Sequence, residues 1–305
     1  TSGTFTNTVQ DVGNGTYTKI LQSPTTSGSA TVTATVGGSG ITDDATVTFA
    51  AGPATKYVVT PASFSVTAGT VVLVTAQLAD ANNNAVSTSG KTVGWSKTGT
   101  GGSFATPTSL TDATGQATIA FTVGVGGTTH VVTATDNTAI TGSSSVITVF
   151  AADGSGTETV APTNVAASST TTTLTFTYTA ATGGMSSGAV EITVPAGWTA
   201  PNTTGGTAGF TTASGGTGTN VVSTAGQVIT VSGVTLAGSA SLTVVYGSGG
   251  GANAVTVPAA TGNVTFTTRQ RSLATSTLTA LTAGSPVVTV NAANGSGTET
   301  VSPTN

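Results

Sequence analysis

The sequence contains no cysteine and only one histidine, His130, in its 305 residues. Without thiols no disulfide framework forms, so stability has to come from packing alone. With a single imidazole, the common pairs of nucleophile and base and most transition-metal sites cannot be assembled. No orienting partner for His130 is evident, and we expect it at an exposed or edge position. The sequence therefore predicts a protein without catalytic residues that is not an enzyme.

Charged residues are also scarce. They make up 5% of the chain, against about 25% in ordinary globular proteins. The net charge is −4 and only six Lys and Arg are present, which do not cluster, so nucleic acid is not expected as a partner. No run of about 20 apolar residues is available to span a bilayer.

Threonine takes the place of charge. The chain contains 73 threonines and 42 glycines; threonine is β-branched and suits a pleated surface, and glycine is typical of turns. The stretch "TTTLTFTYTA" at 171–180 places Leu174, Phe176 and Tyr178 on one face and threonines on the other, which is the alternation of a half-buried strand. Because no long 3.6-residue periodicity appears, the sequence predicts an all-β protein.

Two internal repeats indicate a tandem array. "AADGSGTETVAPTN" at 151–164 returns as "AANGSGTETVSPTN" at 292–305, an interval of 292 − 151 = 141 residues. A second repeat has an offset near 100, since "ATVTAT" at 30–35 matches "HVVTAT" at 130–135. Such self-similarity is typical of repeated modules strung head to tail. We expect four parts, the first a C-terminal half-domain and the last a linker with the first strand of a further repeat: 1–51, 52–150, 151–291 and 292–305.

Residues 52–150 show about seven strand patterns separated by turn signals, which favours an immunoglobulin-like sandwich of antiparallel strands with Trp95 in its core. The expected strands lie near 56–60, 63–67, 71–80, 91–97, 115–123, 129–136 and 144–150. The stretch "VLVTAQLADANNNAVSTSGKTVGWS", followed by "GGSFATPTSLTDATGQATIAFT", resembles the bacterial Ig-like domains of invasin- and intimin-type adhesins. That resemblance implies the sandwich fold and a spacer role, and it extends to 1–50 as half a domain.

Residues 151–291 differ from this pattern. "NVAASSTTTTLTFTYTAATGGMSSGAVEITVPAGWTAP" at 164–201 resembles a larger β-sandwich repeated in long secreted bacterial surface proteins. About eight strands fit, near 157–161, 172–180, 188–194, 209–212, 227–236, 240–246, 262–269 and 286–291. Pro162 and Pro303 are expected where a strand begins or where a junction is stiffened.

Three acidic residues are weak candidates for calcium, because calcium prefers carboxylate and carbonyl oxygens and stiffens junctions in surface proteins. They are Asp80, in the Asn-rich "DANNNA", and Asp153 and Glu158 in the repeated junction. Asp153 becomes Asn294 in the second copy, and neither loop has EF-hand spacing. The alternative is that these residues only stabilise turns, and no other cofactor is expected.

Two further features bear on cross-links and assembly. Residues 151–291 contain no lysine, so a Lys–Asn cross-link is excluded there, whereas a Thr–Gln ester near Gln227 or Gln270 with Glu191 is conceivable. Arg269 and Arg271 alternate onto one face, where they are expected to bind a carboxylate of a neighbouring domain.

The leading interpretation is a non-catalytic segment of a large extracellular prokaryotic surface protein, as a stalk or self-assembling fibre. Its partners are expected to be other copies or neighbouring repeats, and a host or substrate surface reached through a separate tip. The alternative is a carbohydrate- or ligand-binding module, in which Trp198 with Tyr178 or Tyr246 stacks on a sugar. Thr-x-Thr runs also suggest ice binding, but periods of 100 and 141 residues do not supply a flat array.

Overall fold

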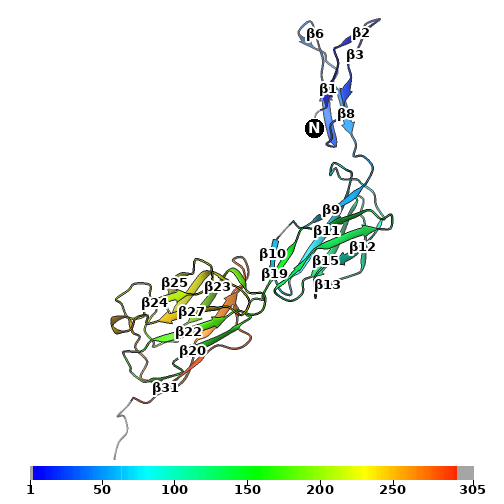
Figure 1. Ribbon diagram of the computed structural model, residues 1–305. Helices are drawn as coiled ribbons and strands as arrows, with labels where there is room; N and C mark the ends of the chain where they lie inside the picture. Colours follow the sequence, from blue (N-terminus) through cyan, green and yellow to red (C-terminus); the bar gives the residue numbers. More distant parts are fainter. Residues whose placement is uncertain (1–2, 63, 294–305) are drawn as a thin grey trace, which may run out of the picture.

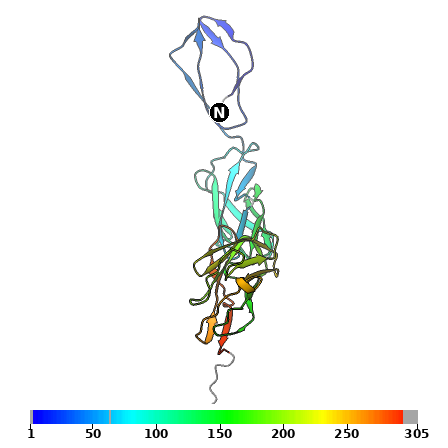
Figure 2. The ribbon, with the colours of Figure 1, turned by 90° about the vertical axis from the view of Figure 1, so that its left-hand side faces the viewer.

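The structure is a computed structural model that describes residues 3–62 and 64–293. Its elements are strands, apart from the single-turn helix η1 (Gly251–Asn253). Figures 1 and 2 show three groups of strands that follow one another along an elongated, bent molecule. Within the described residues no helix has the length and apolar character needed to cross a bilayer.

The first group, residues 3–52, contains only two-stranded sheets among its described strands. The pairs are β1 with β4, β2 with β3, β5 with β8, and β6 with β7. In chain order these strands are Thr4–Phe5, Gln10–Gly13, Thr16–Thr18, Leu21–Gln22, Gly28–Val32, Thr35–Val36, Ser39–Gly40 and Ala45–Phe49.

The middle group is a sandwich with strand orders β13-β15-β11-β9, β14-β12-β17-β18 and β10-β19-β16. Its core contains Tyr57, Trp95, Phe121 and Ile147. Strands β9 to β19 are Lys56–Thr60, Phe64–Thr67, Val71–Ala79, Thr92–Lys97, Ser103–Phe104, Thr108–Leu110, Gln116–Thr122, Thr128–His130, Val132–Asp136, Thr141–Ser143 and Ile147–Phe150.

The third group is a larger sandwich with its own core, which runs from Val160 to Val290. Its strand orders are β20-β22-β27-β24, β25-β26-β23-β29-β30 and β21-β31-β28. Strands β20 to β31 are Thr157–Ala161, Asn164–Ala166, Leu174–Thr179, Met185–Thr193, Thr211–Ser214, Val221–Ala225, Val228–Leu236, Ser241–Tyr246, Gly262–Thr265, Thr267–Arg271, Thr279–Ala280 and Val287–Asn291.

The expected fold class, tandem Ig-like β-sandwiches, is confirmed, and so is the packing of alternating side chains. Leu174, Phe176 and Tyr178 are buried on one face of β22, and the threonines between them are only partly buried. Trp95 lies in the core and its Nε1 donates a hydrogen bond to Ser109 Oγ over 2.9 Å. The period-2 pattern therefore identified which face of each strand is apolar.

The structure differs from the sequence prediction in three respects. The expected strands 129–136 and 262–269 are each divided, the first into β16 and β17 and the second into β28 and β29. The short strands β13, β14, β18, β21, β25 and β30 lie outside the expected strands. The sandwiches are not wholly antiparallel, because β10 pairs with β19 and β21 pairs with β31 in parallel. Residues 294–305, which include Asn294, Pro303 and the expected first strand of a further repeat, lie outside the described residues.

Candidate functional site

The structure corrects the expectation for His130. Its strand β16 is at the edge of a sheet, as expected, but the side chain is buried rather than exposed. His130 Nδ1 lies 2.9 Å from the carbonyl oxygen of Thr98, and its ring packs edge-on against Phe121 at 5.2 Å between centroids. In the part of the chain that the structure describes, no three His, Cys, Asp or Glu side chains gather into a possible metal site. Two other kinds of feature stand out: the parallel strand pairs that close each sandwich and the contacts between neighbouring groups of strands.

In each sandwich, a strand near the start of its segment of chain pairs in parallel with the last strand of that segment. We call this pair a clamp. In the middle sandwich, the clamp is β10 with β19, in which Phe64 pairs with Ile147 and Thr67 with Phe150. Just beyond the paired residues, the Ala68 N–H donates to the Phe150 carbonyl over 2.9 Å. The clamp thus connects the chain that enters the sandwich directly to the chain that leaves it.

The larger sandwich repeats this clamp with β21 and β31. Asn164 pairs with Thr289, and Ala166 pairs with Asn291. Beyond the paired residues, the Ala167 N–H donates to the Asn291 carbonyl over 2.8 Å. The two sandwiches differ in size and sequence, yet both close in the same way.

Both clamps also end in the same kind of turn, at residues 67–70 and 166–169. In each turn the N–H of the fourth residue donates to the carbonyl of the first, over 3.2 and 3.3 Å. The third residue has a positive φ, +81° at Gly69 and +59° at Ser168. These are features of a type II turn, whose second residue has a φ that proline also adopts.

The geometry of a clamp determines how it responds to tension. A pull along the chain moves the two parallel strands in opposite directions along their common axis. The hydrogen bonds of a parallel ladder are evenly spaced, so they resist this shear together rather than opening one at a time. A clamp at the closing strands therefore places the resistance of each sandwich directly on the path of the force.

The first junction is held by Asn84 and Asp80, in the loop after β11. Asn84 Nδ2 donates to the Thr25 carbonyl, and the Ser27 N–H donates to Asn84 Oδ1, both over 2.8 Å. Asp80 Oδ2 accepts from Asn84 Nδ2 and from the Gly52 N–H, also over 2.8 Å. The hydrogen bond from Asn84 is the main reason that the pKa of Asp80 falls to about 2. The loop thus binds the first group of strands to the middle sandwich.

The second junction is a close contact between backbones. The Ala151 N–H donates to the Gly184 carbonyl over 3.2 Å. A Cβ atom on Gly183, where φ is +101°, would lie 2.6 Å from Gly126 Cα and from the Gly127 nitrogen. Glycine lets the loops of the two sandwiches approach this closely. The junction is therefore short and leaves no room for a side chain.

Asp153 fixes the loop that joins β29 to β30. Its Oδ1 accepts from the Ser272 N–H and the Ser276 hydroxyl, both over 2.8 Å. Its Oδ2 accepts from the Thr277 N–H over 3.1 Å. Asp153 follows directly on the second junction, so these bonds tie the entering chain to the body of the larger sandwich.

Glu158 lies inside the larger sandwich, on the inward face of β20. Its Oε2 accepts a hydrogen bond from the Thr268 hydroxyl, and its Oε1 has no hydrogen-bond partner among the described residues. Burial raises the pKa of Glu158 to about 7, and the bond from Thr268 opposes this rise. Near neutral pH this side chain is therefore close to its titration midpoint.

The three calcium candidates thus serve as hydrogen-bond acceptors in three separate settings: the first junction, the β29–β30 loop and the core of the larger sandwich. The donors at Asp80 and Asp153 are mainly backbone N–H groups and side-chain amides or hydroxyls. Binding of calcium by Asp80, Asp153 or Glu158 stays a prediction.

The prediction of an aromatic platform that binds a sugar is wrong. Trp198 is 4% exposed, and Tyr178 and Tyr246 are 1% and 0% exposed. The Trp198 ring packs against Phe266 at 5.1 Å between centroids, and the Tyr246 hydroxyl donates to the carbonyl of Thr199. These rings fill the core because a large apolar area gains more from burial than from exposure, so they present no face to a sugar.

The structure also corrects the expectation that the two arginines bind a carboxylate of a neighbouring domain. Arg269 pairs with Glu191 of the same sandwich, 3.4 Å between Nη1 and Oε1, and donates to the Leu278 carbonyl over 2.6 Å. Neither contact reaches a neighbouring domain. Arg271 Nε is buried without a partner among the described residues.

The residues considered for an ester cross-link are engaged elsewhere. Gln227 Nε2 donates to the carbonyls of Pro195 and Trp198, over 3.2 and 3.0 Å. Gln270 Nε2 donates to Ser272 Oγ over 2.8 Å. The acid buried beside a threonine is Glu158 rather than Glu191.

Residues 1–52 match the family model described as Invasin, domain 3. No curated protein matches the chain.

Several solved structures of bacterial surface proteins are similar to the chain. The Escherichia coli adhesin FdeC is 21% identical; the match covers 93% of this chain and 81% of that one, with a TM-score of 0.41. Invasin, a bacterial integrin-binding protein, is 15% identical, with a TM-score of 0.34. The match covers 92% of this chain and 49% of that one, so the chain spans about half of that protein. A C-terminal intimin fragment, solved with the intimin-binding domain of the translocated intimin receptor, is 13% identical, with 80% and 65% covered and a TM-score of 0.34.

Proposed function

We propose that this chain is a structural, non-catalytic segment of an extracellular bacterial surface protein of the adhesin type. It serves as a stalk that transmits force and sets distance. In this proposal residues 52–150 and 151–291 are complete sandwich modules, and residues 1–51 contribute half of another. The match of residues 1–52 to Invasin, domain 3 supports this assignment.

The observation that carries the proposal is the pair of clamps. Each sandwich has a separate core, and in each a parallel pair joins the entering chain to the leaving chain. Tension therefore passes from one sandwich to the next through two such ladders in series. Resistance to shear along the chain is a property that a stalk under tension needs.

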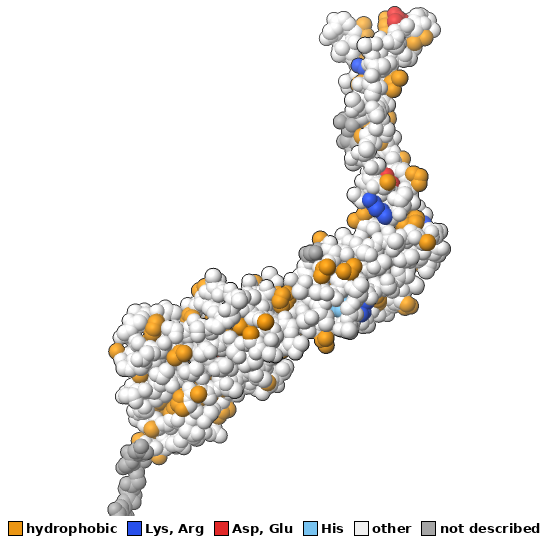
Figure 3. Space-filling model, viewed as in Figure 1, with side chains coloured by type: hydrophobic (Ala, Val, Ile, Leu, Met, Phe, Trp, Pro, Cys, Tyr) orange, Lys and Arg blue, Asp and Glu red, His pale blue; other side chains and the backbone are white. Residues whose placement is uncertain are grey.

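The partners belong to the same proposal. One of the similar solved structures is an invasin described as integrin-binding, and another is an intimin fragment in complex with the intimin-binding domain of its receptor. By analogy, a separate tip beyond this segment contacts a host surface. The second proposed partner is another copy of the chain, which associates side by side with the first. Figure 3 shows a surface on which few side chains are charged, so little electrostatic repulsion opposes such contacts.

The clamp is tested by replacing Ala68 with proline and pulling the chain from its two ends in a force spectrometer. Proline suits the second position of the 67–70 turn, but it removes the N–H that bonds to the Phe150 carbonyl. One lost hydrogen bond weakens the clamp by about 1 kcal/mol. We expect two separate unfolding events in the parent chain and a lower unfolding force for the middle sandwich alone in Ala68→Pro.

Ala113→Pro is the matched control, because Ala113 holds the second position of the 112–115 turn, in which the Gly115 N–H donates to the Asp112 carbonyl over 3.0 Å. This turn lies outside both clamps, so the unfolding force should not change. A single unfolding event for both sandwiches, or equal forces in Ala68→Pro and the parent chain, would contradict the proposed function.

A further inference from the structure

The middle and larger sandwiches share one strand topology, although they differ in size and sequence. The sheet β9-β11-β15-β13 corresponds position for position to β20-β22-β27-β24, and the sheet β10-β19-β16 corresponds to β21-β31-β28. In both sandwiches the clamp is the parallel pair of these sheets, and the other neighbouring strands run antiparallel. Equivalent loops of the two modules can therefore be compared directly.

The turn that follows β11 or β22 is one of these equivalent loops, and we call it the entry turn. It comprises residues 80–83 in the middle sandwich and residues 181–184 in the larger one. The N–H of its fourth residue donates to the carbonyl of its first residue, over 3.2 and 2.9 Å. The fourth residue has a positive φ in both turns, +67° at Asn83 and +64° at Gly184. The two entry turns thus share their closing hydrogen bond and their left-handed fourth residue.

The second equivalent loop leads into the strand that lies beside the clamp, and we call it the exit loop. In the middle sandwich it comprises residues 123–127, between β15 and β16. The offset of 100 residues in the internal repeat places its counterpart in the first group at residues 23–27, just before β5. At both junctions the exit loop of one group contacts the entry turn of the next module or the residue beside that turn.

At the second junction this contact is between backbones. A Cβ atom on Gly126 would lie 2.7 Å from the carbonyl oxygen of Thr182, in the entry turn of the larger sandwich. The chain that connects the sandwiches meets the same turn, because the Ala151 N–H donates to the Gly184 carbonyl. The turn is thus held at two points, by the exit loop and by the connecting chain.

At the first junction the same two loops meet through side chains. Asn84, directly after the entry turn, bonds to the Thr25 carbonyl and to the Ser27 N–H of the exit loop. The connecting chain again reaches the turn, through the bond from the Gly52 N–H to Asp80. Both junctions therefore use the same pair of loops and two points of contact, and only the chemistry of the contact differs.

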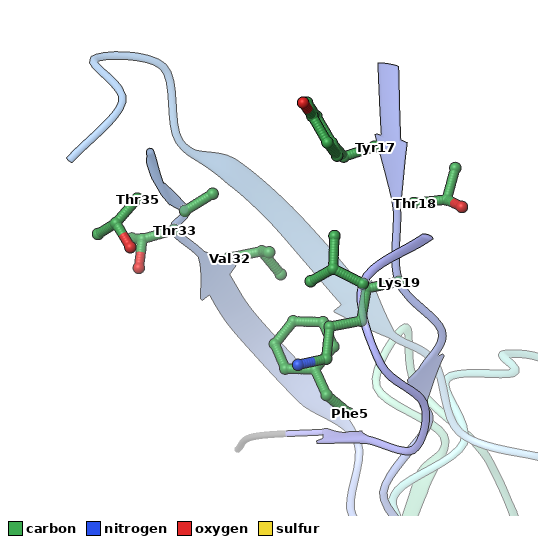
Figure 4. A pocket seen from close by; sticks show the side chains of 9 residues that line it. Phe5, Tyr17, Thr18, Lys19, Val32, Thr33 and Thr35 are labelled. Carbon is green, nitrogen blue, oxygen red and sulfur yellow. The ribbon is translucent and has the colours of Figure 1, made fainter. Parts of the chain in front are cut away.

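Two cavities in the first group take no part in this contact. Figure 4 shows Phe5, Tyr17 and Lys19 around one of them. None of the described residues that line either cavity belongs to the exit loop 23–27. The exit loop therefore contacts the next module independently of the hollowed part of the first group.

We infer that the exit loop of one module and the entry turn of the next form a docking interface that fixes the angle between the modules. A connecting chain alone would let two modules swivel about it, and such motion is the usual behaviour of domains that share a small interface. A second contact beside the connecting chain removes this freedom. In the proposed stalk, which this inference presupposes, the interface keeps the spacing between modules constant.

The glycines of the second junction also select the partner. Only backbones without side chains approach each other so closely, so the exit loop 123–127 fits an entry turn that carries glycine, as residues 181–184 do. The entry turn 80–83 carries asparagines instead, and its neighbour Asn84 bonds to the backbone of a different exit loop. Each exit loop thus matches the entry turn of the module that follows it.

The absence of cysteine makes the angle between the sandwiches measurable in the full chain. Thr118→Cys and Thr159→Cys place one spin label on each sandwich, at exposed positions on β15 and β20. Pulsed electron paramagnetic resonance then gives the distribution of distances between the two labels. A second pair, Thr118→Cys with Asn137→Cys, lies within the middle sandwich and gives the width of a rigid body. We expect the two distributions to be equally narrow.

Gly126→Ala tests the interface itself. The added Cβ would meet the Thr182 carbonyl, so the two loops must separate, and we expect the distribution between the sandwiches to become at least about twofold wider. Gly94→Ala, on β12, is the matched control, because its Cβ would lie 3.6 Å from the Thr135 carbonyl oxygen in ordinary contact. Neither glycine has a positive φ, so neither substitution strains the backbone, and Gly94→Ala should leave the width unchanged.

Two results would overturn the inference: a parent distribution between the sandwiches that is wider than the reference, or equal widths in Gly126→Ala and the parent chain. The stalk function has a separate readout, since the unfolding forces of the clamps do not depend on the angle between modules. Gly126→Ala should therefore keep both unfolding events at the parental forces. A lower force would mean that Gly126 supports a sandwich and not the joint, which also overturns the inference.

Discussion

Buried and half-buried carboxylates show how single residues hold this fold together. Asp136 accepts hydrogen bonds from Lys91 Nζ over 2.7 Å and from the Thr138 N–H over 2.8 Å. Burial by itself would raise the pKa of Asp136, but these donors outweigh it and bring the pKa to about 2. Glu158 has one donor, Thr268, and its pKa moves in the opposite direction. The donors around Asp136, which include the Lys91 ammonium, outweigh its burial, whereas the single Thr268 hydroxyl does not outweigh the burial of Glu158.

Glu158 makes the stability of the larger sandwich depend on pH. Its pKa is about 7 in the folded chain, against 4.5 for a glutamate side chain that is free in water. Between these values the folded state keeps a proton that the unfolded state has lost, so stability falls as the pH rises from about 4.5 to about 7. This rise in the pKa corresponds to roughly 3 to 4 kcal/mol of stability, because a tenfold change in a proton-binding constant equals about 1.4 kcal/mol.

We expect Glu158→Gln to remove this loss, because glutamine keeps the shape and carries no charge. Denaturant unfolding of the larger sandwich at pH 5 and pH 8 measures the effect, and the variant should be the more stable protein at pH 8. Glu191→Gln is the control, since Glu191 is paired with Arg269 near the surface. Equal pH dependence in Glu158→Gln and the parent chain would show that Glu158 does not titrate as described.

Sequence patterns predicted which single residues are buried only where the pattern is local. Alternation correctly placed Trp95 and Leu174 in the cores. His130 is expected at an exposed or edge position because no partner is evident, and Trp198 is exposed only in the binding-module alternative. Both are buried through contacts with residues far along the chain, His130 with Thr98 and Trp198 with Phe266. Contacts between residues on different strands cannot be predicted from the sequence pattern of one strand.

At the scale of elements, the strands were largely predictable and the clamps were not. Expected strands such as 56–60 and 157–161 coincide with β9 and β20, because period-2 alternation and turn residues are local signals. The parallel pairing of β10 with β19 joins residues about 80 positions apart, and no local pattern specifies it. The available signal is the turn after the short strand, "TAGT" in one sandwich and "AASS" in the other.

The loop after β11 provides a prediction for the first junction. Asn84→Ala removes the acceptor of the Ser27 N–H and the donor to the Thr25 carbonyl. Loss of one such bond costs about 1 kcal/mol, so the Ser27 amide should exchange with solvent roughly five- to tenfold faster. Hydrogen exchange with mass spectrometry on the full chain measures this rate.

Asn82→Ala is the matched control, because Asn82 contributes its backbone N–H to Asp80 Oδ1 and this bond survives the substitution. Unchanged exchange at Ser27 in Asn84→Ala would mean that the loop does not hold the junction. Equal acceleration in Asn82→Ala and Asn84→Ala would assign the effect to the loop as a whole instead of to the Asn84 side chain.

For the whole molecule, low charge affects association more than it affects folding. Exposed edge strands offer unpaired N–H and C=O groups, and proteins usually protect them with lysine, proline or a bulge. The edge strand β25 (Val221–Ala225) contains none of these residue types and exposes Val221 and Ala225. The sequence therefore carries little protection against contact between copies along this edge.

We expect copies of the chain to associate with rising concentration, and we expect salt to have little effect because few charges are involved. Sedimentation velocity at about 0.1 and about 1 M salt tests both statements. Val221→Lys combined with Ala225→Lys places two positive charges on β25 and should reduce association, because two copies then repel each other along that edge. Thr203→Lys, in an exposed loop, adds charge away from the edge and should change association less. If the chain stays monomeric at every concentration, the bare edge is tolerated without a partner, and the stalk acts as a single strand of modules instead of a bundle.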